Sequence, residues 1–185
     1  DIHEIIDAAN SQPFSHIHQP GIYVGGHCIP VYPRFYSSVD TAAKLPPLAR
    51  QINDAGPERA VNRLEVELGS LQGMKIGVLG STYRGGVKEM AFSGGFPLVE
   101  ILERKGALPV VHDPMLSDAE LESLGFIPFE LGSTVNAIIV QADHPEYQNL
   151  GANDLGNPTV VLDGRRILDP SLFSGSTTLL TIGRG

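Results

Sequence analysis

Lys75-Ile76-Gly77-Val78-Leu79-Gly80 is the stretch that decides the fold, because a short apolar run that ends in glycine is typical of a buried strand. Similar apolar runs follow at 109–112, 136–140, 159–162 and 179–182, with longer segments between them. One helix is expected to begin near Ser93, and another is expected over 117–124. Strands that alternate with helices predict parallel βαβ units, so the fold class is α/β with a Rossmann-like, doubly wound parallel sheet.

The residues before this sheet have a mostly helical pattern, and we place the domain boundary between residues 71 and 72. Residues 1–71 are then a helical unit, and residues 72–185 are the sheet domain. This helical unit begins with a short amphipathic helix, and a Pro/Gly/His-rich loop is expected to run from there through Tyr36. Helix with interruptions at Pro46-Pro47 and Pro57 is expected from about 40 to 71.

An apolar stripe on the last of these helices comprises Val61, Leu64, Leu68 and Leu71. Such a stripe predicts packing against a core. A helix–helix dimer contact is the alternative that the pattern leaves open.

Bulk composition excludes several classes of partner. The 185 residues carry a net charge of −8 and no basic cluster longer than Arg165-Arg166, which argues against nucleic acid and acidic membrane surfaces. No apolar run approaches the roughly 20 residues of a membrane span. One cysteine excludes an internal disulfide and indicates a reducing, cytoplasmic setting. The chain starts without methionine or a signal pattern, so a fragment or a processed product is expected.

The single cysteine lies in Gly25-Gly26-His27-Cys28-Ile29-Pro30. Two adjacent glycines permit unusual backbone conformations and close approach of a ligand. A thiol presented directly after such a turn is a candidate nucleophile. The alternative is that Cys28 only packs in a core, as free cysteines often do.

Two further loops follow strands, where ligands bind in doubly wound sheets. Residues 80–88 supply hydroxyls and the cations Arg84 and Lys88, which suits a phosphate, although a solvated turn has the same composition. The glycine spacing does not match G-x-G-x-x-G, so this domain is not expected to bind NAD in the usual way. Residues 163–166 place Arg165 and Arg166 after another strand, either to clamp a pyrophosphate or as a surface turn.

The histidines raise two competing site hypotheses. A metal set of His16, His18, His27 and Cys28 fits no common zinc spacing, so no metal is expected. A cysteine hydrolase would need a general base, for which the candidates are His27, His112 and His144.

Taken together, these motifs closely resemble the UDP-glucose/GDP-mannose dehydrogenase family. The resemblance covers nearly the whole chain in order, with segments 7–10, 21–30, 49–54, 75–80, 83–84, 112–114 and 163–166. The His-Cys-Ile-Pro form of the cysteine loop is most similar to the UDP-N-acetylhexosamine branch, such as the UDP-N-acetylmannosamine dehydrogenases. Branches that act on UDP-glucose or GDP-mannose tend to have Ser-Cys or Tyr-Cys there.

This resemblance implies a C-terminal part of a larger enzyme, comprising the end of a central, dimer-forming helical domain and a nucleotide-sugar domain. The cofactor NAD would be bound mainly by an upstream domain. The family oxidises the sugar C6 alcohol twice. In that scheme Cys28 attacks the aldehyde to give a thiohemiacetal, a second hydride loss gives a thioester, and water releases the uronic acid. This chain alone is expected to bind a UDP-sugar without turnover.

Site residues also follow from the resemblance. Those implied to bind the sugar nucleotide are Tyr23, Gly25, Gly26, Tyr83, Arg84, Lys88 and Arg165, and Arg165 is also implied near the cofactor. The chain departs from the family at two positions: Tyr32 stands where an aspartate is usual, and Ala91 where an arginine is usual. Expected partners are a UDP-sugar and a second copy of the chain. The alternative is a non-catalytic nucleotide-binding or dimerisation module in which Cys28 is structural.

Overall fold

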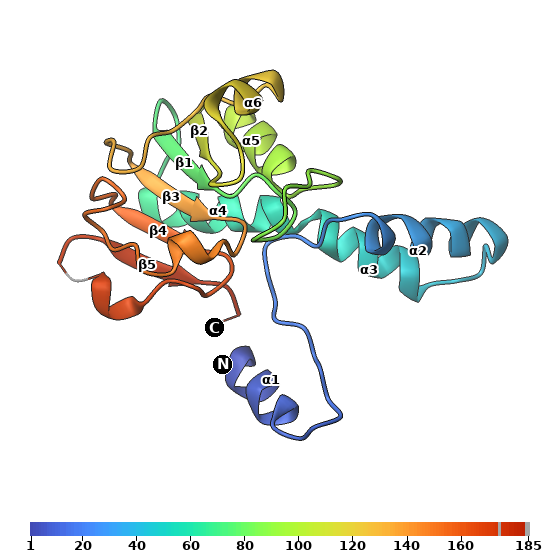
Figure 1. The fold of residues 1–185 in the computed structure, drawn as a ribbon. Helices are drawn as coiled ribbons and strands as arrows, with labels where there is room; N and C mark the ends of the chain where they lie inside the picture. Colours follow the sequence, from blue (N-terminus) through green and yellow to red (C-terminus); the bar gives the residue numbers. More distant parts are fainter. Residues whose placement is uncertain (174, 184–185) are drawn as a thin grey trace.

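A computed structural model describes residues 1–173 and 175–183 and contains a parallel sheet, its covering helices and a projecting helical arm (Figure 1). The strands are β1 (Lys75–Leu79), β2 (Leu108–His112), β3 (Ala137–Val140), β4 (Val160–Asp163) and β5 (Thr178–Thr181). They lie in the order β2-β1-β3-β4-β5, and every pairing is parallel. The predicted α/β class and parallel sheet are therefore confirmed.

One face of the sheet is covered by α4 (Gly56–Leu68) and α5 (Gly95–Arg104). The side chains of Val61, Leu64 and Leu71 are fully buried in one cluster with apolar residues of β1 and β4. The stripe therefore packs against the core as predicted, and the alternative of a dimer contact through it is wrong. By its packing, α4 joins the sheet, although it precedes the predicted boundary at residue 71.

The other face of the sheet is covered mainly by irregular chain and two short 3₁₀ helices, η1 (Pro145–Tyr147) and η2 (Pro170–Leu172). Tyr147 is fully buried there. At the end of the sheet near β2, α6 (Asp118–Ser123) starts with Ser117 as N-cap in a complete capping box, which confirms the helix predicted over 117–124. Helix α5 starts two residues after Ser93, whose hydroxyl accepts a hydrogen bond from the Gly95 N–H at 3.1 Å.

The helices before the sheet are α1 (Ile2–Asn10), α2 (Cys28–Val39) and α3 (Leu45–Asp54), and the last two pair as an arm that projects from the sheet (Figure 1). The expectation of loop through Tyr36 is wrong, because α2 starts at Cys28. Pro30 lies in its first turn, where the missing N–H costs nothing, and Pro33 removes only one helical hydrogen bond. The prolines at 46–47 and 57 start α3 and α4 rather than interrupting a helix.

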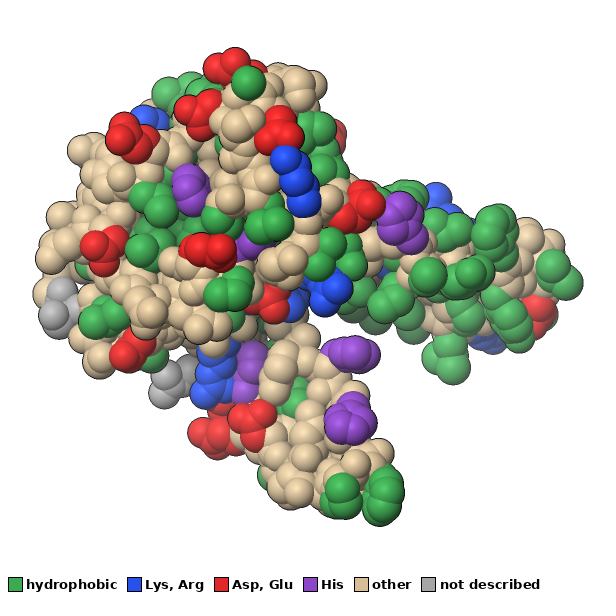
Figure 2. Space-filling view, viewed as in Figure 1, with side chains coloured by type: hydrophobic (Ala, Val, Ile, Leu, Met, Phe, Trp, Pro, Cys, Tyr) green, Lys and Arg blue, Asp and Glu red, His purple; other side chains and the backbone are tan. Residues whose placement is uncertain are grey.

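The arm exposes many large apolar side chains, which Figure 2 shows gathered along it. They are Tyr32, Phe35, Tyr36, Val39, Leu45, Leu48 and Ile52. Within the described ranges, no helix is both long and apolar enough to cross a membrane.

Candidate functional site

Three segments meet at the carboxyl ends of the strands and form a cleft of about 410 Å³. They are the strap (residues 18–26), the β1 loop (residues 80–94) and the turn after β4 (residues 164–166). The carboxyl edge of a doubly wound sheet is where such folds bind ligands. The cleft brings together five of the predicted site residues with four others; its lining is His18, Gln19, Tyr23, Val24, Gly25, Ile29, Tyr83, Arg84 and Arg165.

The strap is held in place by the C-terminal end of α3. Asn53 accepts a hydrogen bond from the Val24 N–H (2.8 Å) and donates one to the Val24 carbonyl (3.3 Å). Both bonds go to backbone groups, so Asn53 fixes the path of the strap whatever side chain Val24 carries. The sequence pattern placed Asn53 inside a family motif but did not show this role.

Tyr23 is fixed by two charged side chains of the same helix. Its hydroxyl donates to Asp54 at 3.2 Å, and the buried Arg50 guanidinium contacts both that hydroxyl (3.3 Å) and Asp54 (2.7 Å). Burial, and then the negative charge of Asp54, raises the pKa of Tyr23 above its ordinary value. Tyr23 therefore remains a neutral phenol at the edge of the cleft at physiological pH.

The two glycines of the strap allow it to press against the β1 loop. A Cβ on Gly25 would lie only 2.2 Å from the Phe92 carbonyl oxygen. Gly26 has a positive φ of 85°, and its N–H donates to the Ala91 carbonyl at 2.9 Å. The close approach expected from the glycine pair is therefore one between backbone segments of this chain.

Asp113, which directly follows β2 and is almost fully buried, holds the start of the β1 loop in place. One carboxylate oxygen accepts hydrogen bonds from the backbone N–H groups of Ser81 (2.7 Å) and Thr82 (2.9 Å). Burial alone would raise the pKa of Asp113, but hydrogen bonds from His144 and from the N–H groups of Thr82 and Met115 hold it well below its ordinary value. Asp113 is therefore a buried carboxylate whose hydrogen bonds order the start of the loop.

His144 completes this anchor. Its Nε2 lies 2.9 Å from the Thr82 hydroxyl and 3.3 Å from Asp113, and its Nδ1 accepts a hydrogen bond from the Gly86 N–H at 3.3 Å. This pattern assigns the proton to Nε2. In a dinucleotide-binding sheet, an acidic residue in this region binds the ribose. Here Asp113 already accepts the N–H groups of the β1 loop, so this edge of the sheet does not fit the ribose of NAD.

Arg165 and Asp143 join the turn after β4 to the β1 loop. Arg165 donates to Asp143 at 3.0 Å, and Asp143 also accepts the Gly85 N–H at 3.0 Å. Burial opposes ionisation of Asp143, but the Gly85 N–H and the Arg165 charge hold its pKa below the ordinary value. A Cβ on Gly21 would lie 2.5 Å from an Arg165 guanidinium nitrogen, so the glycine lets this side chain pass under the strap.

Arg84 supplies the second cation of the cleft. Its Nε donates to the Tyr83 hydroxyl at 2.9 Å, and its guanidinium carbon lies 5.7 Å from the centre of the Tyr83 ring. Among the residues that the structure describes, Arg84 has no carboxylate partner. The cleft therefore carries two guanidinium groups, one of which is without an internal counter-charge.

Cys28 is exposed as the first residue of α2, and its neighbour Ile29 lines the cleft. His27 is directed to Glu89, with 3.1 Å between Nε2 and the carboxylate. In the described part of the chain, no hydrogen bond joins Cys28 to a histidine, so the hydrolase hypothesis has no base there. Within residues 1–173 and 175–183, no three His, Cys, Asp or Glu side chains lie close enough together to hold a metal ion.

Lys88 lies outside the cleft, although the sequence placed it with the sugar-nucleotide ligands. Its ammonium group pairs with Glu120 of α6 at 2.5 Å. The reason is the turn at Gly85-Gly86, which directs the second half of the β1 loop towards α6.

Comparison with known proteins places the chain in a family. Residues 77–170 match the model of the UDP-glucose/GDP-mannose dehydrogenase family UDP-binding domain, and residues 1–55 match the central domain of the same family. The UDP-N-acetyl-D-mannosamine dehydrogenase of Pyrococcus horikoshii is 30% identical over 176 residues, which are 91% of this chain and 41% of that protein. The chain thus spans less than half the length of this relative.

Solved structures agree with this assignment. The UDP-D-ManNAc dehydrogenase structure from Pyrococcus horikoshii aligns with a TM-score of 0.79 at 28% identity, covering 100% of this chain and 44% of that one. A UDP-glucose dehydrogenase from Pyrobaculum islandicum aligns with a TM-score of 0.80 at 25% identity, covering 97% and 43%. The resemblance carried by the cysteine loop and the strand-end motifs is confirmed, and this chain belongs to the UDP-glucose/GDP-mannose dehydrogenase family.

Proposed function

We propose that this chain is the nucleotide-sugar part of an NAD-dependent UDP-N-acetylhexosamine 6-dehydrogenase. The observation that carries the proposal is the cleft, which brings Arg84, Arg165 and the glycine strap together. Cys28 is exposed and does not line the cleft, but the next residue, Ile29, does. Its volume of about 410 Å³ lies within the range of small-ligand sites. The family match to a UDP-binding domain supports a uridine nucleotide as the ligand.

The two arginines are proposed to bind the pyrophosphate. Guanidinium groups donate paired N–H groups to phosphate oxygens, and those of Arg84 have no internal carboxylate to compete among the described residues. Arg165 keeps its bond to Asp143 and is thereby held rigid. Tyr23 and Gly25 line the same cleft and are proposed to contact the sugar or the ribose.

Cys28 is the proposed nucleophile. Its thiolate sulfur attacks the C6 aldehyde carbon, a C–S bond forms, and the carbonyl oxygen takes up a proton to give a thiohemiacetal. Cys28 is exposed as the first residue of α2, so its sulfur is accessible to a ligand. NAD would supply the oxidation of this intermediate, and the β1 loop occupies Asp113, the acid that could otherwise bind a cofactor ribose. We therefore propose that a domain outside these 185 residues holds the cofactor, and that this chain alone binds without turnover.

Titration calorimetry tests the ligand. UDP and a UDP-N-acetylhexosamine should bind the chain and compete for one site, whereas GDP-mannose should bind more weakly. Arg84→Gln should weaken UDP binding at least tenfold, which is the loss of one charged hydrogen-bonding group. Lys88→Gln removes the same charge outside the cleft and should leave the affinity unchanged. Absence of binding, or equal effects of the two variants, would contradict the sugar-nucleotide assignment.

A non-catalytic module is the second candidate, and one observation favours it. Tyr32 stands where the family has an aspartate, and its exposed ring packs near Phe35 at 6.3 Å between ring centres. Alkylation of Cys28 separates the two functions. A substrate-site thiol should react with iodoacetamide in the folded protein and be protected by UDP-N-acetylhexosamine, whereas equal labelling rates with and without ligand would favour the module.

The arm formed by α2 and α3 is proposed to pair with a second copy of the chain. Its exposed apolar side chains include Phe35, Val39 and Leu45. Sedimentation velocity at micromolar concentration tests this. A single species with the mass of the monomer would contradict a homodimer formed in this way.

A further inference from the structure

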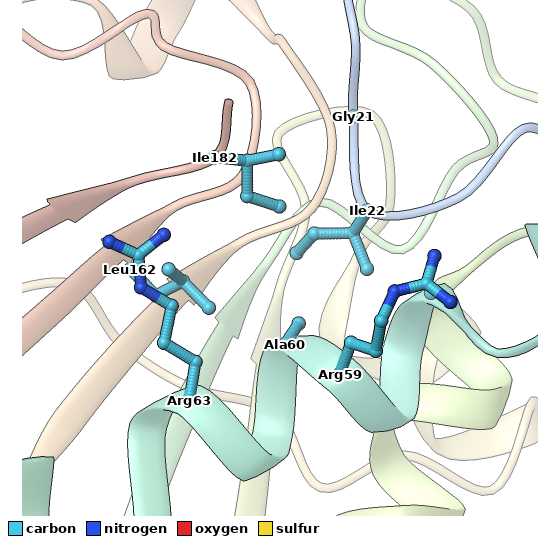
Figure 3. Close-up of a pocket in the computed structure, with 8 residues that line it drawn as sticks. Gly21, Ile22, Arg59, Ala60, Arg63, Leu162 and Ile182 are labelled. Atoms are coloured by element: carbon cyan, nitrogen blue, oxygen red, sulfur yellow. The ribbon is translucent and has the colours of Figure 1, made fainter. Parts of the chain in front are cut away.

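A second cavity of about 190 Å³ lies where the strap meets α4 and the end of β5 (Figure 3). It shares no lining residue with the cleft described above. The lining residues that matter for its chemistry are Ile22, Arg59, Ala60, Arg63, Leu162 and Ile182. The cavity is therefore a separate feature of the fold, built mainly from aliphatic groups and two arginines.

The two arginines stand on either side of the cavity. They lie four residues apart on α4, and Figure 3 shows their side chains flanking Ala60. Arg59 donates to the Ile52 carbonyl at 2.8 Å, and Arg63 donates to the Thr181 carbonyl at 2.7 Å. Each contact uses one guanidinium nitrogen, so each group retains further N–H donors.

The charges of these arginines have no internal counterpart. Six other Lys and Arg side chains pair with a carboxylate, in a chain with 13 basic and 21 acidic residues. Within residues 1–173 and 175–183, neither Arg59 nor Arg63 has such a partner. Each arginine therefore keeps a charge and N–H donors that an anion at the cavity could use.

The floor and walls between the arginines are apolar. Ile22, Leu162 and Ile182 direct aliphatic side chains towards the space above Ala60 (Figure 3). We propose that this cavity is a binding site for a small organic anion with a compact apolar body, either a carboxylate or a phosphomonoester. The apolar body fills the space above Ala60, and the anionic group lies at the rim of the cavity beside the guanidinium group of Arg59 or Arg63.

Benzoate and phenyl phosphate serve as probes, and benzyl alcohol serves as the uncharged analogue. Each is titrated into the ¹⁵N-labelled protein, and the backbone amide shifts of Ile22, Ala60 and Ile182 are followed. At least one anion should shift these amides with saturation, and benzyl alcohol should not. A difference between the two anions identifies which acid the site prefers.

Paired variants test the role of the arginines. Arg59→Gln combined with Arg63→Gln should weaken the anion at least tenfold. Arg34→Gln combined with Lys44→Gln removes the same charge from the arm and should leave the affinity unchanged. Ala60→Met keeps both charges but fills the cavity, so it should also abolish saturation while the melting temperature confirms folding.

Three results would overturn the proposal: no saturable shift at the cavity amides, equal weakening in both double variants, or full binding in Ala60→Met. The readout is independent of nucleotide binding, since UDP calorimetry reports on the cleft alone. A failure here therefore leaves the proposed dehydrogenase function untouched, and the converse also holds.

Discussion

The substitution Asp113→Asn tests the anchor of the β1 loop. The carboxylate accepts the N–H groups of Ser81, Thr82 and Met115 and also contacts His144. An asparagine of the same shape keeps one oxygen, but its NH₂ group must face either the loop donors or the Met115 N–H.

The expected cost follows from the donors that lose an acceptor. A buried donor without a partner costs about 1–3 kcal/mol, and a bond to a charged acceptor is worth about 1.5–3 kcal/mol. We therefore expect Asp113→Asn to lower the free energy of unfolding by about 2–4 kcal/mol at pH 7. Urea denaturation followed by circular dichroism measures this difference.

The pH dependence gives an independent check. The folded pKa of Asp113 is depressed, so its charge stabilises the fold above the unfolded pKa of about 3.9, and this contribution is lost as pH falls towards the folded pKa. The gap between wild type and variant should therefore be equal at pH 7 and pH 5, and smaller by about 1 kcal/mol at pH 3.

Asp118→Asn is the matched control, since Asp118 is exposed in the first turn of α6. Its loss should cost less than about 1 kcal/mol, the usual value for a charge at a helix start. Unfolding free energies of the two variants that agree within about 0.5 kcal/mol at pH 7 would refute this account of Asp113.

Three further substitutions test other parts of the structure. Gly25→Ala should reduce UDP affinity and lower the melting temperature more than Gly86→Ala, because a Cβ on Gly25 would lie 2.2 Å from the Phe92 oxygen, whereas Gly86 has open space and only the strain of its positive φ of 69°; equal melting temperatures would contradict this. Asn53→Ala should weaken UDP binding by about fivefold as the strap loosens, at a stability cost of about 1–2 kcal/mol; unchanged calorimetry would show that the strap needs no such support. Ser117→Ala should lower the free energy of unfolding by about 1 kcal/mol through loss of the α6 cap, and a neutral urea midpoint would count against that role.

The sheet was predictable because its signals are local. Each strand is a short apolar run followed by a turn, and the observed bounds differ from the predicted ones by at most one residue. The α4 stripe was equally readable, since Val61 and Leu64 recur at helical spacing and are both buried. Helix α2 was missed because Pro30 and Pro33 suggest a loop, although prolines are tolerated in and near a first turn.

The candidate site was predictable only in part. Tyr23, Arg84 and Arg165 lie in motifs that follow strands or glycines, and the structure brings them together. The residues that hold them act over long separations, as Asn53 does on the strap, and spacing along the chain does not reveal such partners. The position of Asp113, an acidic residue directly after a strand, is the signal that could have indicated its role at this edge of the sheet.

The inward orientation of Asp113 has a consequence for protein engineering. A designer who grafts a G-x-G-x-x-G fingerprint onto β1 to create a dinucleotide site would delete the loop whose N–H groups this acid needs. The transplanted loop would then leave a desolvated anion beside His144, with no ribose yet bound to accept it. Conversion of this sheet into a dinucleotide site would therefore remove the hydrogen bonds that keep a buried carboxylate satisfied.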